Sequence, residues 1–287
     1  MRQQWCNGER GTHACGTHAN LLFVRPEKPL DPDPAVARLR HGPVSYTDTG
    51  RGRTVVGVHG LPASGRDFRW LDSAIGGRVR FVRPDLPGFG ASPGSGQVGH
   101  TFREYSRVIR EFCEVVGLTD AIAFGHSMGG AIAVDAAAQS SRIAALALVN
   151  SAGPIYHRGM FPRTYRNFVR LVDLHPVARR AVVAVARPIA RAMGFSKRVS
   201  DDELVLATRI CAGYRPLDLE EHLRHLAKPV LIAWSDDDPS VQPRVSKALV
   251  DCADRPHSLR YPTGGHNLQS TRATELADAI VAWADTV

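Results

Sequence analysis

Residues 121–138, AIAFGHSMGGAIAVDAAA, decide how the rest of the chain is organised. The apolar run from Ala121 to Phe124 is typical of a buried strand, and the alanine-rich run that follows Gly129 is typical of a buried helix. Between them lies Gly-His-Ser-Met-Gly, a Gly-x-Ser-x-Gly pattern that marks a sharp strand-to-helix turn carrying a serine nucleophile. Glycines relieve the crowding in so strained a turn. We therefore predict that Ser127 is raised above a sheet, beside backbone N–H groups that can hold an oxyanion.

Length and composition are those of a globular protein. The 287 residues suffice for one large α/β domain, or for a core with one insertion, and 44% of them are hydrophobic. Apolar runs all fall short of a membrane span, and the N-terminus lacks the apolar core of a signal peptide. The five cysteines are odd in number and scattered, so no disulfide framework is expected. These features predict a cytoplasmic protein in a reducing compartment.

The strands and helices before residue 150 alternate. In chain order we expect a hairpin at 36–48, strands at 54–58 and 79–82, a helix after Thr101, the strand and helix around Ser127, and a strand at 143–149. Thr101 and Glu104 form a capping box, and Gly117 ends that helix. Such alternation is typical of a doubly wound, mostly parallel sheet, so the fold class is α/β.

The alternation stops at residue 151. Four helical patches and no strong strand fill residues 151–227, after which strands at 229–234 and 258–261 alternate with helices at 243–252 and 271–285. We therefore divide the chain into a poorly ordered leader (1–35), the first part of the core (36–150), a helical cap (151–227) and the second part of the core (228–287). Ligands of open α/β sheets bind at the carboxyl ends of the strands, which the cap would cover.

A serine nucleophile needs a base, and the base needs an acid to orient it. The strand that ends at Trp234 leads into three consecutive aspartates, Asp236, Asp237 and Asp238, and only one of them need face the base. His266 lies in a glycine-rich loop between the last strand and the last helix. Among twelve histidines, its place after the serine and the acids makes it the candidate base.

Five motifs in a fixed order resemble those of the α/β-hydrolase superfamily over residues 37–287. They are His59-Gly60-x-Pro62, Asp85-x-Pro-Gly-x-Gly-x-Ser92, Gly125-His-Ser-Met-Gly129, Asp238-Pro239 and Gly265-His266. The resemblance implies that Ser127 is the nucleophile, Asp238 the acid and His266 the base. It also implies an oxyanion hole formed by the backbone N–H groups of Leu61 and Met128. Within these motifs we expect Asp85 to shape a turn, and His59 and His126 to be structural.

The resemblance implies a serine hydrolase, esterase- or lipase-like, that cleaves ester or thioester bonds through an acyl-enzyme and uses no metal or organic cofactor. Serine at the turn argues against the aspartate-dependent dehalogenases and epoxide hydrolases of the superfamily. Carbon–carbon bond hydrolysis and cofactor-free perhydrolase (haloperoxidase) activity use the same three residues and stay open. A non-catalytic ligand receptor on this fold is a further alternative, since a fold does not fix a function.

Positive charge is concentrated in the cap. The chain carries a net charge of +8, and residues 158–198 hold ten Lys and Arg against one acid, Asp173. On a helix, Arg180, Arg187 and Arg191 would share one face, although Pro188 is expected to break or kink it. We expect these arginines to face water and the apolar side to cover the active-site cleft, which favours a mainly apolar acyl substrate. Contact of this basic surface with a membrane stays open, and no nucleic-acid partner is expected.

Overall fold

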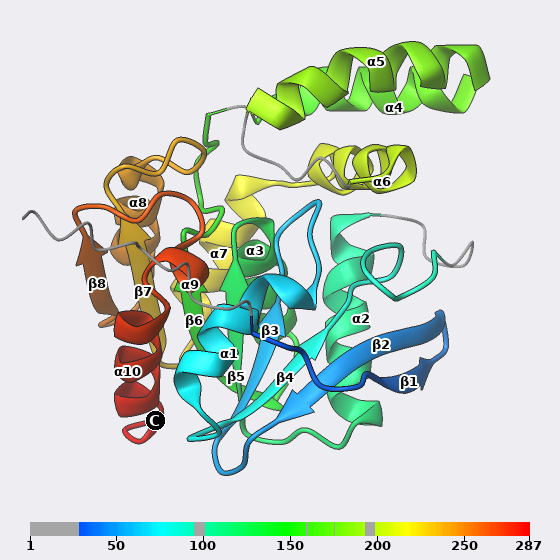
Figure 1. Cartoon of the computed structure of the whole chain (residues 1–287). Helices are drawn as coiled ribbons and strands as arrows, with labels where there is room; N and C mark the ends of the chain where they lie inside the picture. The colour runs from blue at the N-terminus through cyan, green and yellow to red at the C-terminus, as the bar shows by residue number, and fades with distance from the viewer. Residues whose placement is uncertain (1–28, 95–100, 159, 175, 193–198) are drawn as a thin grey trace, which may run out of the picture.

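The computed structural model describes residues 29–94, 101–158, 160–174, 176–192 and 199–287, to which all structural statements refer (Figure 1). Most of the leader predicted at 1–35 lies outside these residues. The described part begins just before the first strand, and Asp31 already contacts the core, where it forms an ion pair with Arg83.

Eight strands form one sheet in the order β1-β2-β4-β3-β5-β6-β7-β8. Strands β1 and β2 form an antiparallel hairpin, β2 is antiparallel to β4, and the remaining neighbours are parallel. The strands are β1 (Ala35–Leu39), β2 (Gly42–Thr49), β3 (Thr54–Val58), β4 (Arg80–Pro84), β5 (Ala121–His126), β6 (Ile143–Val149), β7 (Val230–Ser235) and β8 (His257–Tyr261). The predicted doubly wound, mostly parallel α/β fold is confirmed. All parallel strands therefore end at the same edge of the sheet, with β5 near its centre.

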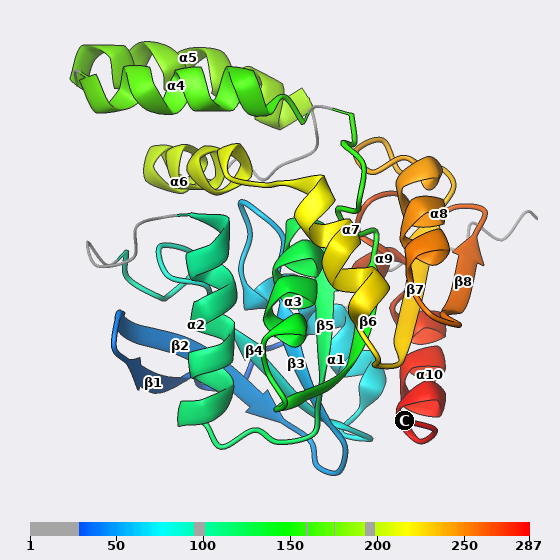
Figure 2. The ribbon, with the colours of Figure 1, turned by 180° about the vertical axis from the view of Figure 1, so that it is seen from behind.

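Helices cover both faces of the sheet, and each face has its own apolar core (Figures 1 and 2). One face carries α2 (Phe102–Val115), α3 (Met128–Ala138), α7 (Pro216–His225) and α8 (Pro243–Cys252); the other carries the 3₁₀ helix η1 (Gly65–Phe68), α1 (Arg69–Ile75), α9 (Leu268–Thr271) and α10 (Ala273–Ala284). Because side chains alternate along a strand, Val56 and Val58 of β3 enter the first core while Val55 enters the second. Strands buried on both sides explain the nearly continuous apolar runs of the sequence.

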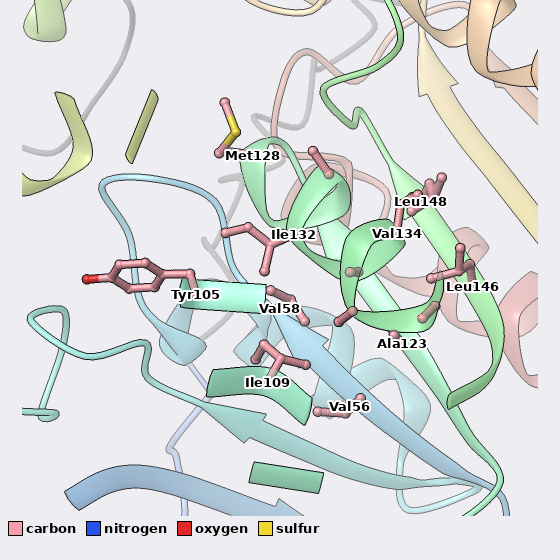
Figure 3. Packing of buried hydrophobic residues seen from close by; sticks show 14 of the residues in the cluster. Val56, Val58, Tyr105, Ile109, Ala123, Met128, Ile132, Val134, Leu146 and Leu148 are labelled. Atoms are coloured by element: carbon pink, nitrogen blue, oxygen red, sulfur yellow. The ribbon is translucent and has the colours of Figure 1, made fainter. Parts of the chain in front are cut away.

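Helix α3 is buried on nearly all sides, which its small residues permit. A Cβ atom built on Gly125 of β5 would lie 2.3 Å from the Cα of Gly130 in α3, so strand and helix pack with no room for a side chain there. Figure 3 shows Ile132 and Val134 of this helix within a cluster built from α2, α3 and the strands beneath them. The turn that carries Ser127 is thereby held on a rigid support.

Most elements lie where the sequence predicts them, including the capping box of Thr101 and Glu104 at the start of α2. The short helices η1, α1 and α9 are exceptions. Of these, α1 is the longest, and no helix was expected between β3 and β4. It has only seven residues, and two of them, Leu71 and Ile75, form its fully buried apolar contact with the core. Two apolar positions are too few to produce a recognisable helical period.

Four helices lie between β6 and β7 in the chain, and the first three of them lie above the carboxyl edge of the sheet (Figures 1 and 2), whereas α7 packs on the sheet face beside α3. The outermost two, α4 (Pro162–Leu174) and α5 (Pro176–Ala192), lie side by side and form what we call the α4–α5 hairpin. Helix α6 (Asp201–Ala212) lies between this hairpin and the core, to which it contributes Leu206 and Ile210. Among the described helices, none combines the length and the hydropathy needed to span a bilayer.

The expected role of α5 is corrected by its packing. Its apolar side lines a small apolar pocket shared with α4 and α6, where Val182 and Val183 meet Phe168. The apolar side therefore holds the three helices together and does not cover the cleft. Pro188 lies inside α5 without ending it. The proline removes the hydrogen bond to the carbonyl of Ala184, which is exposed and can be hydrated instead.

Candidate active site

Ser127 connects β5 to α3 in a strained backbone conformation, with φ 54° and ψ −127°. Its surroundings leave no space for side chains: a Cβ atom on Gly129 would lie 2.1 Å from the carbonyl oxygen of Val58, and one on Gly60 would lie 3.0 Å from the Cβ of Ser127. A serine in this region costs backbone energy that the packing of β3, β5 and α3 must offset, and such strain is typical of functional residues.

The structure brings together the three residues that the sequence singles out. The Nε2 atom of His266 lies 3.0 Å from the Oγ of Ser127, and its Nδ1 atom lies 2.8 Å from Oδ2 of Asp238. A carboxylate can only accept, so Nδ1 carries the proton and Nε2 is left to accept the serine hydroxyl. The Asp238 side chain is fully buried, whereas that of His266 is 13% exposed. The serine hydroxyl therefore faces a base that is already oriented.

The three consecutive aspartates have three different partners. Oδ1 of Asp238 accepts hydrogen bonds from the N–H groups of Ser240 and Val241, which leaves Oδ2 for His266. Asp236 forms an ion pair with Arg260 on the surface. Asp237 accepts the N–H groups of Gly264 and Gly265, at 2.9 and 2.7 Å, in the loop that leads to His266. Of the three aspartates, Asp238 is the one that contacts the histidine side chain.

His59 and His126 have backbone partners, in agreement with their expected structural role. In His59, Nδ1 donates to the carbonyl of Gly60 and Nε2 accepts the N–H of Leu86. His126 donates from Nε2 to the carbonyl of His266, with the two rings 4.8 Å apart. Burial lowers the pKa of both side chains, that of His126 to about 3, with the charge of His266 adding to the effect. Both rings are therefore neutral at pH 7 and add no competing charge beside the base.

Leu61 and Met128, the predicted oxyanion-hole residues, flank the serine on two elements. Met128 is the first residue of α3, where a backbone N–H has no acceptor within the helix and the helix dipole favours negative charge. Leu61 follows Gly60, whose close approach to Ser127 places the segment after β3 against the same turn. The structure thus positions both peptide units next to the serine.

Asp85 shapes the turn after β4, as expected from its motif. Its two carboxylate oxygens accept the N–H groups of Gly65 and Ala91, both at 2.7 Å. The hydroxyl of Ser92 closes the turn by donating to the carbonyl of Asp85. With both oxygens satisfied in this way, Asp85 is no rival to Asp238.

Asn150, at the end of β6, is a site residue that the sequence reasoning missed. Its Nδ2 donates to the carbonyls of Gly265 and His266, at 2.8 and 2.9 Å, and its Oδ1 accepts the N–H of Ser235 at 3.0 Å. The side chain is fully buried, and its backbone has a φ of 41°. The hydroxyl of Ser235 also donates to Gly265. A buried asparagine directly after an apolar strand, at the same sheet edge as Ser127, was the available signal.

Comparison with known proteins gives a consistent assignment. A family model described as "Alpha/beta hydrolase family" matches residues 55–279. The chain is 26% identical to "Uncharacterized hydrolase YugF" of Bacillus subtilis, over 82% of this chain and 90% of that protein. It is 27% identical to "Haloalkane dehalogenase 2" of Mycobacterium tuberculosis, over 84% of this chain and 91% of that protein. An esterase structure from Exiguobacterium antarcticum (EaEST) superposes with a TM-score of 0.70 at 18% identity, covering 88% of this chain and 99% of that one. The chain therefore belongs to the α/β-hydrolase family and is a hydrolase of that kind.

Proposed function

We propose that the protein is a serine hydrolase that cleaves carboxylic ester or thioester bonds. The observation that carries the proposal is the hydrogen-bonded series from Ser127 through His266 to Asp238. It joins a nucleophile, a base with one unprotonated ring nitrogen and a buried carboxylate, which together satisfy the geometric requirement for nucleophilic catalysis.

In the proposed reaction, Nε2 of His266 takes the hydroxyl proton while Oγ of Ser127 attacks the substrate carbonyl carbon. The N–H groups of Leu61 and Met128 hold the resulting oxyanion. The imidazolium then returns its proton to the leaving alcohol or thiol, and an acyl-enzyme remains on the serine. A water molecule, deprotonated by His266, releases the acid and restores the serine. Asp238 stabilises the imidazolium and holds its orientation throughout.

A mainly apolar acyl group fits the surroundings of the serine best. Leu61 and Met128 belong to one apolar cluster that continues into the region between β6 and β7 through Met160 and Leu206. A cluster shared by both sides of the site offers apolar surface to an acyl chain. We assign residues 151–227 the role of a cap on the same ground.

Dehalogenation, the activity named for one relative, is disfavoured by the nucleophile. Displacement of a halide by Ser127 would leave an ether on the enzyme, and an ether has no carbonyl carbon for water to attack. Carbon–carbon bond hydrolysis and perhydrolase activity pass through the same serine and stay as alternatives that differ in substrate.

A fluorophosphonate probe and a panel of esters, thioesters and vinylogous diketones test the proposal. The probe should label Ser127, and p-nitrophenyl esters of increasing chain length should be hydrolysed. Ser127→Ala should lower kcat by about 10⁴-fold or more and leave the thermal unfolding transition unchanged. Activity of the Ala variant within tenfold of the wild type would overturn the serine mechanism. Turnover of diketones in place of esters would instead move the assignment to carbon–carbon hydrolysis.

A further inference from the structure

The α4–α5 hairpin exposes arginines and apolar side chains on one surface. Its two helices contain seven arginines and one acidic residue, Asp173. We define the outer face of the α4–α5 hairpin by its exposed residues Arg163, Arg166, Arg170, Leu171, Val177, Arg180, Val185 and Arg191. Positions 163, 166 and 170 share one side of α4, and positions 177, 180 and 191 share one side of α5, while Leu171 and Val185 lie at the borders of these two sides.

The acidic residues near the hairpin form ion pairs between α6 and the helices of the hairpin. Asp173 pairs with Arg209 of α6, while Asp201 and Asp202 of α6 pair with Arg187 and Arg179. These pairs attach the hairpin to α6. The five arginines of the outer face form no ion pair with an acid in the described part of the chain. Within the described residues, no acidic side chain compensates the positive charge of this face.

Large apolar side chains are exposed on this surface and beside it. Leu171, Val177 and Val185 are 45%, 63% and 56% exposed, and Phe161, just before α4, is 61% exposed. Folding of the hairpin does not require them, because its inner side packs through Phe168, Val182 and Val183. A face meant only for water would gain nothing from these apolar residues.

We propose that the outer face of the α4–α5 hairpin binds the surface of an anionic lipid bilayer. Arginines attract anionic headgroups, and the neighbouring leucine and valines can enter the boundary between headgroups and acyl chains. A second copy of the chain would bring like charges together, and a nucleic acid would leave the apolar residues in water. The hairpin is the outermost element above the carboxyl edge of the sheet, so this contact turns the Ser127 side of the molecule toward the lipid (Figures 1 and 2).

Vesicle co-sedimentation tests the proposal with phosphatidylcholine alone and with added phosphatidylglycerol. The wild type should bind the mixed vesicles only, and salt should weaken binding. Each arginine near an anionic surface raises the membrane binding constant about fivefold. Arg170→Glu with Arg180→Glu should therefore weaken binding by more than about 20-fold. Leu171→Ser with Val185→Ser should also weaken it. The matched control is Arg38→Glu with Arg51→Glu, exposed arginines in β1 and in the β2–β3 turn, which should bind like the wild type.

Three outcomes would overturn the proposal: no binding to the mixed vesicles, equal loss in the control pair, or no effect of the two serine substitutions. In the last case, displacement by duplex DNA would identify a general polyanion surface. None of these measurements uses catalysis, so the serine mechanism is tested separately.

We also infer that Asn150 is a positioning residue for His266, an inference that rests on the proposed function. The loop before the histidine contains Gly264 and Gly265 with φ of 158° and 63°, and glycines leave such a loop many conformations. Asn150 fixes it through the two carbonyls, and Ser235 and Asp237 add bonds to the same glycines. A shift of 1 Å in a catalytic group can cost about 10²-fold in rate.

Asn150→Ala should lower kcat by about 10- to 100-fold with KM nearly unchanged, slow labelling by fluorophosphonate in parallel, and shift the pH at which kcat/KM is half-maximal. Ser235→Ala, which removes one bond to the loop, should have a smaller effect in the same direction. Ile143→Val, a buried substitution in the strand that precedes Asn150, controls for lost stability. If Asn150→Ala resembles Ile143→Val in kcat and pH profile, the positioning role fails while the serine mechanism stands. Full activity of Ser127→Ala would remove both.

Discussion

The choice among the three aspartates is decided by single hydrogen bonds. Asp238→Asn should lower kcat by about 10⁴-fold, because an amide can donate to Nδ1 and so favours the wrong histidine tautomer. Asp236→Asn loses only a surface ion pair and should act like the wild type. Asp237→Asn should fall between them, since its oxygen holds the loop before His266. Steady-state kinetics on one ester decides the order; a largest loss at Asp237 would contradict the assignment.

Burial of the His126 side chain lowers its pKa and therefore makes the stability of the fold depend on pH. Its pKa is lowered to about 3, chiefly by burial, against about 6.5 in the unfolded chain. Between these values the unfolded chain binds a proton that the folded chain does not, so the free energy of unfolding rises with pH. This contribution is complete above about pH 6.5, and about 1.4 kcal/mol is lost per unit as the pH falls below it.

Urea unfolding between about pH 4 and 6 should therefore show a shallower pH dependence for His126→Gln than for the wild type. In the wild type, the ring protons of His126 should keep the chemical shift of a neutral imidazole down to about pH 4. Equal slopes in the two proteins, together with a ring that titrates near 6.5, would show that the site is open to water.

What the sequence predicts at this scale is set by residue type and chain order. Ser127 and His266 lie in glycine motifs that leave few alternative candidates for nucleophile and base. The hydrogen bond between their side chains agrees with the roles expected from their order in the chain. The choice of Asp238 needed the resemblance, because three adjacent carboxylates look alike until their partners are known. Asn150 could not be predicted to contact His266, since 116 positions separate the two residues and only the folded sheet brings them together.

At the scale of elements, the segment before β1 is attached to the sheet by charge. The guanidinium of Arg83 in β4 is 1% exposed and forms ion pairs with Asp31, at 3.0 Å, and with Asp72 of α1, at 2.9 Å. Asp31→Asn should lower the free energy of unfolding by about 2 kcal/mol. The loss stays below the roughly 3–5 kcal/mol of an entirely unpaired buried charge because Asp72 remains. Denaturant titration measures it.

The neighbouring exposed aspartate provides the control, since Asp33→Asn should change the free energy of unfolding by less than about 0.5 kcal/mol. Similar values for the two variants would mean that the segment before β1 adds nothing to the core. This contact could not be predicted from the sequence, because a proline- and aspartate-rich stretch has no apolar period and an ion pair between distant residues produces no periodic pattern. Helix α1 was missed for a related reason, its short length.

At the scale of the whole molecule, the fold has a tightly packed part and a peripheral one. The central strands and α3 are buried almost completely, whereas the α4–α5 hairpin packs mainly on α6 and exposes more than half of its residues whose side chains the structure describes. Regions with fewer buried apolar contacts open locally at a lower free energy, so the hairpin should open more easily than the central sheet. Amide hydrogen exchange should be slowest in β3, β5 and α3 and much faster in α4 and α5.

The attachment of the hairpin can be separated from its charge within a single helix. Arg179 and Arg187 of α5 pair with acids of α6, whereas Arg180 and Arg191 of α5 face outward. Arg179→Gln with Arg187→Gln should therefore speed exchange in α4 and α5 several-fold and leave β5 and α3 unchanged. Arg180→Gln with Arg191→Gln removes the same charge from the same helix and should leave exchange unaltered. If both pairs speed exchange equally, net charge and not the ion pairs sets the stability of the hairpin. If β5 responds as well, the hairpin and the sheet open as one unit, and the peripheral part is not independent.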